Sequence, residues 1–189
     1  MMTLSLTNTT NHMKTLQWFL TLAVATTTHQ LKANNNDICD TRLFKQLVNA
    51  EKSGIERPAL KPSKSLNFLI SEYEILCPMQ VERDFNGDNQ IDWVGIIKQN
   101  GQFHLSAYLS GKNQYRLVQI KQYKTLPNNQ YLEAYTEKKL RESTGVIGFA
   151  AGVKYAVVEN KLGNENSVAY IWNGKTLEKL AEFKFVPNF

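Results

Sequence analysis

The chain has 189 residues, of which 42% are hydrophobic and 21% charged, and its formal net charge is +5. This composition is that of a folded globular protein and excludes a disordered chain. The length suits one domain with a substantial core.

The amino-terminal segment has the layout of a secretory signal peptide. A lysine precedes an apolar run over residues 16–25, and the first acidic residue is Asp37. A membrane-spanning helix needs roughly 18 to 20 apolar residues, so this run is too short and we expect no membrane span after cleavage. We expect cleavage after Ala33. That assigns residues 1–33 to the signal peptide and residues 34–189 to one domain of a periplasmic or secreted protein.

The charge of the cleaved chain argues against a nucleic-acid partner. Cleavage removes two lysines and no acidic residue, which leaves 20 basic and 17 acidic residues and a net charge of +3. The most basic aromatic stretch, YRLVQIKQYK over residues 115–124, alternates like a strand, and neither of its faces is a basic stripe. We therefore expect no binding to nucleic acid.

Two cysteines remain after cleavage, Cys39 and Cys77. A pair of cysteines in an exported protein most often forms one disulfide. A metal site or two free buried thiols is the alternative. A bond would tie the amino-terminal segment to the start of the sheet, and loop entropy predicts a stabilisation of about 4 kcal/mol.

The first half of the cleaved chain predicts one helix and a linker. In DICDTRLFKQLVNAEK, residues 37–52, apolar residues recur at helical intervals and an aspartate can serve as the cap. The next stretch, residues 53–65, holds two prolines and a glycine and predicts an irregular linker. Residues 66–85 are rich in β-branched and aromatic side chains, which favours strand.

The second half predicts hairpins. Asn100 and Gly101 stand between two strand-like runs and predict a type I′ turn, because both turn positions need a positive φ. In the second run we expect Phe103, Leu105, Ala107 and Leu109 to face inward, with His104, Ser106 and Tyr108 on the opposite face. Further hairpins are expected at SGKNQ, residues 110–114, and at Asn173 and Gly174. A buried strand pair with a glycine at a bend is expected over residues 144–158.

These elements predict an α+β fold. It consists mostly of an antiparallel β-sheet, arranged as a hairpin meander, with one amino-terminal amphipathic helix.

The stretch DFNGDNQID, residues 84–92, concentrates three aspartates and two asparagines in nine residues. Counted from the first aspartate, oxygen-bearing side chains fall at positions 1, 3, 5 and 9, and position 7 can offer a backbone carbonyl. Ca²⁺ takes six to eight oxygen ligands, and alternate positions of a tight loop point such oxygens toward one centre. The predicted ligands of one structural Ca²⁺ are Asp84, Asn86, Asp88, Gln90 and Asp92.

The loop resembles the calcium loop of FG-GAP/VCBS-type repeats, an Asp-x-Asn-Gly-Asp-x-x-x-Asp pattern followed by a hydrophobic strand. The resemblance implies that the matching side chains bind calcium. The loop is also similar to the first nine positions of an EF-hand. It differs at position 6, where Asn89 replaces glycine, and at position 12, where Gly95 replaces glutamate. Gly87 and Asn89 suit the left-handed conformations that such a loop needs.

The resemblance covers about a dozen residues and occurs once, so a β-propeller is not implied. More loosely, the cleaved chain is similar to small exported bacterial proteins with one such loop before an antiparallel sheet. An aspartate-rich turn without an ion is the alternative interpretation.

The sequence favours a binding protein over an enzyme. His104 is the only histidine after cleavage, no free cysteine is expected, and nothing in the spacing of Glu72, Glu74, Glu82 and Glu133 makes them converge as hydrolase carboxylates. We expect a protein-binding, inhibitor or immunity-type module whose partner is another protein of the cell envelope. Aromatic anchors expected on its surface are Tyr108, Tyr115, Tyr131 and Trp172. A carbohydrate-binding domain and a hydrolase are the alternatives.

Overall fold

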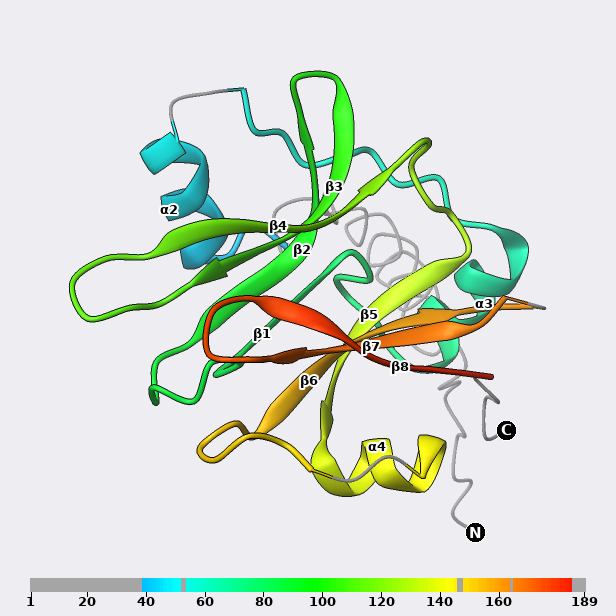
Figure 1. Ribbon diagram of the computed structural model, residues 1–189. Coiled ribbons are helices and arrows are strands. Elements are labelled where there is room, and N and C mark those ends of the chain that lie inside the picture. Colours follow the sequence, from blue (N-terminus) through cyan, green and yellow to red (C-terminus); the bar gives the residue numbers. More distant parts are fainter. Residues whose placement is uncertain (1–38, 52–53, 146–147, 164, 185–189) are drawn as a thin grey trace, which may run out of the picture. The chain divides into compact units, whose positions relative to one another are not determined.

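The computed structural model describes residues 39–51, 54–145, 148–163 and 165–184 (Figure 1). All of them belong to one compact unit, Asn36–Phe189. The predicted signal peptide and its cleavage site lie outside the described residues. Within the described part, no helix is long and apolar enough to cross a membrane.

Two four-stranded antiparallel sheets form the core of this unit (Figure 1). In each sheet the strands follow one another in chain order, so each is a simple meander. The first sheet contains β1 (Gln80–Arg83), β2 (Asp92–Gln99), β3 (Gln102–Leu109) and β4 (Arg116–Tyr123). The second contains β5 (Gln130–Thr136), β6 (Tyr155–Lys161), β7 (Ser167–Trp172) and β8 (Leu177–Phe183). The predicted mostly antiparallel β fold is confirmed, with two sheets rather than one.

Three helices occur in the described residues: α2 (Arg42–Glu51), α3 (Lys64–Glu72) and α4 (Glu137–Thr144). The first confirms the helix predicted near residues 37–52. The second shows that the strand interpretation of residues 66–72 was wrong. The Ser63 side chain accepts a hydrogen bond from the Leu66 amide and caps α3, whose Leu66 and Leu69 then face the core at helical spacing.

The main hydrophobic core joins the two sheets. Its buried members from and beside the first sheet include Phe85, Val94 and Leu105, and those of the second include Leu132 and Val157. All five are at most 5% exposed. The two sheets therefore share one core, whose burial supplies the main stabilising free energy of the fold.

The other face of the first sheet is covered by α2. Phe44 and Leu47 of this helix pack against Trp93, Ile97 and Tyr108. Strands β2 and β3 are therefore buried on both faces. The predicted alternation of β3 is confirmed, because Leu105, Ala107 and Leu109 face the main core and Tyr108 packs with α2. His104, Ser106 and Tyr108, on the opposite face as expected, are at most 7% exposed.

The hairpin predictions have mixed outcomes. Asn100 and Gly101 form the two-residue turn between β2 and β3, with φ of 51° and 77°. The later hairpin also exists, but β7 and β8 are joined by four residues, 173–176, and only Gly174 of the predicted pair has a positive φ. Of the strand pair predicted over residues 144–158, the structure contains one strand, β6, which begins at Tyr155; Thr144 ends α4, and residues 148–154 form no strand.

Cys39 and Cys77 form a disulfide with a Cα–Cα distance of 5.5 Å, as predicted. Cys39 stands three residues before α2 and Cys77 three residues before β1. The bond therefore ties the segment that carries α2 to the entry of the first sheet.

Candidate metal centre

The aspartate loop, residues 84–92, joins β1 to β2 and ends on the first residue of β2. Asp84 and Asp92 at its two ends are buried, while Asp88 is exposed. The loop is therefore a turn with its ends anchored in the protein and its middle carboxylate at the surface.

Asp84 organises the first half of the loop. Its Oδ1 accepts a hydrogen bond from the Gly87 amide at 2.7 Å, and its Oδ2 accepts one from the Asn89 amide at 3.0 Å. A carboxylate offers about four lone-pair sites, so each oxygen keeps one after these bonds. Asp84 can thus hold the backbone of the loop and still contact a cation.

Two further side chains fold back onto the loop. The Asp88 amide donates to Oδ1 of Asn86 at 3.0 Å, and the Gln90 amide donates to Oδ1 of Asp88 at 2.9 Å. These bonds turn the side-chain oxygens of positions 3 and 5 toward the loop's own backbone. The oxygens retain acceptor capacity beyond the single bond from the backbone.

Asp92 has a different environment. Its Oδ2 accepts hydrogen bonds from the amides of Phe85 and Asn86, at 2.9 and 3.2 Å. Its Oδ1 lies 2.7 Å from both the amide nitrogen and the hydroxyl oxygen of Ser110. Burial raises the pKa of the Asp92 carboxyl, and the hydrogen bonds from Ser110, Phe85 and Asn86 oppose that rise. All lone pairs of the Asp92 carboxylate therefore accept hydrogen bonds. They come from Phe85 and Asn86 at the start of the loop and from Ser110, the residue after β3.

Ser110 is a member of the site that the sequence did not reveal. Its hydroxyl oxygen lies 3.0 Å from Oδ1 of Asp88 as well as 2.7 Å from Oδ1 of Asp92. One hydroxyl proton serves one of these two acceptors at a time. Asn86 adds a bond from its side-chain amide to the Ser110 carbonyl at 2.8 Å. The loop is thus fastened to the end of β3, which stands eighteen residues further along the chain.

The backbone of the loop requires the residues found at two positions. Gly87 has φ of 80° and Asn89 has φ of 65°, which confirms the expected left-handed conformations. A Cβ atom on Gly87 would lie 2.8 Å from the carbonyl of Gly152. Lys154 donates to Oδ1 of Asn89 at 3.0 Å. The segment before β6 therefore packs closely on the loop and leaves no room for a side chain at position 87.

The charge of the site is uncompensated within the described residues. No ion pair of that part of the chain involves any of the three aspartates. The lysine that reaches the loop contacts an asparagine rather than a carboxylate. Likewise, no three histidine, cysteine, aspartate or glutamate side chains of the described residues form a ready-made metal cluster. The three carboxylates are instead held by backbone amides and one hydroxyl.

The predicted ligands fit calcium to different degrees. Asp84, Asn86 and Asp88 each keep an oxygen with free acceptor capacity, and Gln90 can add its carbonyl. The Asp92 carboxylate has no lone pair to spare in the arrangement described. The donor set is hard oxygen throughout, which suits Ca²⁺. Four of the five predicted residues therefore have an oxygen with spare acceptor capacity, and the fifth would need a rearrangement of Ser110.

The other predicted functional residues do not form a second centre. Tyr108 and Tyr131 are 3% and 8% exposed, so the prediction that they are surface anchors was wrong. His104 is buried in β3. Glu133 is paired with Lys139 on the face of the second sheet covered by α4.

Comparison with known proteins finds no relative. No protein-family model matches the chain, and neither curated proteins nor solved structures give a match. The resemblance to FG-GAP/VCBS-type calcium loops therefore depends on the loop residues alone.

Proposed function

We propose that the protein is an exported, non-enzymatic binding domain whose aspartate loop holds one structural Ca²⁺. The observation that carries the proposal is that three aspartates stand within nine residues of one loop and none of them forms an ion pair in the described part of the chain. Like charges brought together in one loop repel one another, and a bound divalent cation would remove that cost. The disulfide supports an oxidising compartment, in agreement with export.

Asp84, Asn86, Asp88 and the Gln90 carbonyl would hold the ion, which supplies positive charge and no chemistry. Asp92 would secure the loop through the amides of Phe85 and Asn86. Because Ser110 ties the same loop to the end of β3, ordering the loop would stabilise three consecutive strands of the first sheet. The role of the metal is therefore structural.

The partner that we propose is another protein of the cell envelope. Phe68, Tyr73 and Leu76, on α3 and just after it, are 52%, 51% and 65% exposed. Large exposed apolar side chains this close in sequence favour contact with a protein surface. Of the anchors predicted from sequence, only Tyr115 and Trp172 remain partly accessible. A carbohydrate-binding domain or a hydrolase is the second proposal.

Calorimetric titration of the purified mature protein with Ca²⁺ tests the metal directly. We expect one binding site in the wild type and a large loss of affinity in Asp88→Asn, which keeps the shape of the side chain and removes its charge. Glu142→Gln, which removes one exposed carboxylate from α4, is the matched control and should bind as the wild type does. An absence of binding heat in the wild type would show that the loop is only an acidic turn.

A further inference from the structure

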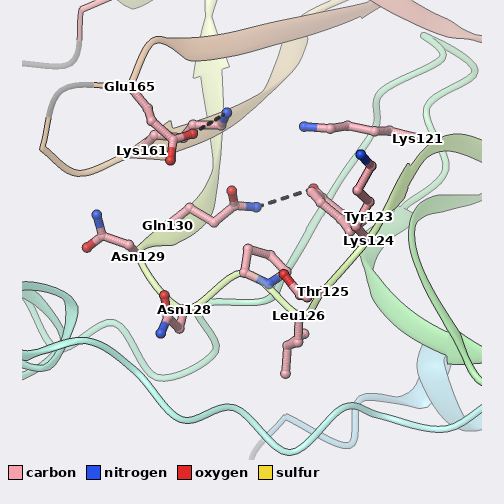
Figure 2. Close-up of a pocket in the computed structure, with 11 residues that line it drawn as sticks. Lys121, Tyr123, Lys124, Thr125, Leu126, Asn128, Asn129, Gln130, Lys161 and Glu165 are labelled. Carbon is pink, nitrogen blue, oxygen red and sulfur yellow. Dashed lines mark hydrogen bonds and ion pairs between the residues drawn. The ribbon is translucent and has the colours of Figure 1, made fainter.

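A polar hollow of about 300 Å³ lies where the end of β4, the connection over residues 124–129 and the start of β5 meet the end of β6. Figure 2 shows Lys121 and Lys124 on one side of it and Lys161 and Glu165 on the other, with Gln130 below Lys161 and pointing across to Tyr123. This volume is at the lower end of the roughly 300 to 1,000 Å³ found for small-molecule sites. The hollow is large enough for one small ligand.

A fully buried carboxylate stands behind the hollow. Glu159 of β6 is 0% exposed, and each of its oxygens lies 3.1 Å from the Lys121 ammonium. Tyr123 and Tyr170 donate their hydroxyls to the two oxygens at 3.0 and 3.2 Å. All four acceptor sites of Glu159 are therefore used. The carboxylate fixes Lys121 at the wall and cannot itself bind a ligand without losing these partners.

The tyrosine hydroxyls of this network stay protonated. Burial raises the pKa of Tyr123 and of Tyr170, and the charge of Glu159 raises both further. Gln130, 5% exposed, donates its side-chain amide to the Tyr123 hydroxyl at 3.2 Å. The amide has a second N–H and a carbonyl oxygen, and Gln130 lines the hollow. Because Lys121, Tyr123 and Tyr170 are committed to Glu159, the Gln130 carboxamide is the part of this network that remains to recognise hydroxyl groups.

The rim carries one positive charge in excess. Lys121 is neutralised by Glu159 and Lys161 by the exposed Glu165. Lys124 is exposed, and among the described residues it forms no ion pair. One ammonium group therefore remains for an anionic group of a ligand.

From this geometry we infer that the hollow binds a small hydroxylated monocarboxylate, such as a sugar acid. Lys124 pairs with the ligand carboxylate, and Gln130 with its neighbours contacts the ligand hydroxyls. The size of the hollow limits the ligand to about one sugar ring. The site is distinct from the aspartate loop and does not depend on calcium.

Titration of the mature protein with sodium glucuronate, followed by NMR, tests the inference. Glucose, which lacks the carboxylate, and acetate, which lacks the hydroxyls, are the comparison ligands. We expect saturable binding of glucuronate that is at least about tenfold tighter than that of either comparison ligand. Shifted resonances should include those of Lys124 and Gln130. Equal affinity for glucose or acetate, or no saturation by glucuronate, would overturn the inference.

Two lysine variants locate the site. Lys124→Met should weaken glucuronate binding roughly tenfold, because it removes the unpaired charge of the rim. Lys112→Met removes another exposed lysine, from the turn that precedes β4, and should leave the affinity unchanged. Unaltered affinity in Lys124→Met would overturn the inference. Asp88→Asn should not change glucuronate binding, so failure of the calcium proposal and failure of this one are separable.

Discussion

The two sheets have the same topology but different first connections. Both are four-stranded meanders, and in both the third and fourth strands pair with a register shift that leaves one residue of the fourth strand unmatched. That residue is Ile120 in β4 and Leu180 in β8. The first connection is the aspartate loop in the first sheet, whereas in the second it contains α4. The strand framework is therefore repeated, and the first connections differ: one is an acidic loop and the other contains a helix of mixed charge.

The two connections are also stabilised differently. The second begins with Thr136, which caps α4, and continues into Leu140, which is buried against Tyr135 and Ala156. The first connection, the aspartate loop, has two buried aspartates, Asp84 and Asp92. It also has an apolar residue, Ile91, that is 50% exposed. Apolar burial thus secures one connection, while the other carries negative charge that no ion pair of the described residues offsets. Only the first should respond to a cation.

The largest expected effect is removal of the disulfide, which joins the segment before α2 to the segment before β1. A variant with both Cys39→Ser and Cys77→Ser should lose about 4 kcal/mol of unfolding free energy, because the unfolded chain regains the entropy of a long loop. Urea denaturation measures the loss. Hydrogen exchange should locate the weakened protection in α2 and the first sheet. A variant with the same urea midpoint as the wild type would contradict this assignment.

The next effect concerns the polar link between the sheets. Lys121→Met would leave Glu159 buried without its counter-charge and should cost about 3 kcal/mol, at the low end of the range for broken buried pairs because Lys121 is 33% exposed. Urea denaturation again provides the measurement.

The matched control for this link is the double variant Lys121→Met with Glu159→Gln. Because it removes the buried charge as well, it should recover most of the lost stability. If the double variant is as unstable as the single one, the loss arises from packing and not from charge.

The smallest effect is at the cap of the second connection. The Thr136 hydroxyl accepts a hydrogen bond from the Lys139 amide, so Thr136→Ala should cost about 1 kcal/mol. The loss should be equal in calcium and in chelator, because α4 contains no part of the metal loop. A thermal melt in each buffer provides the check. A calcium-dependent loss would contradict the separation of the two connections.

Local signals in the sequence predicted local structure well. Asn100 and Gly101 specify their turn because both need a positive φ, and the two cysteines had only each other as partners. The α3 helix was missed because its aromatic and β-branched residues favour strand, whereas its Ser63 cap and the burial of Leu66 outweigh that propensity.

Long-range features could not be read from the chain. Simple alternation places Val118 and Tyr123 of β4 on opposite faces, yet both pack on the core between the sheets. The unmatched Ile120 changes the phase of the strand, and nothing in the local sequence marks it. The same register shift lets both Lys121 and Tyr123 form hydrogen bonds with Glu159. The polar hollow beside them could therefore not be predicted from the sequence.

The aspartate loop falls between these cases. The ligand oxygens that we propose follow from spacing within nine residues, and the left-handed conformations of Gly87 and Asn89 could be expected. The part played by Ser110 depends on the pairing of β2 with β3 and has no signal in the spacing.

Hydrogen exchange of the mature protein in millimolar calcium and in chelator is the most direct test of the central claim. We predict that amides of residues 84–92 and of the start of β2 exchange about a hundredfold more slowly in calcium that is a hundredfold above its dissociation constant, equivalent to about 2.7 kcal/mol. Amides of β5, α4 and β6 should exchange at the same rate in both buffers. Identical exchange of residues 84–92 in calcium and chelator would contradict the claim that a metal ion orders the loop.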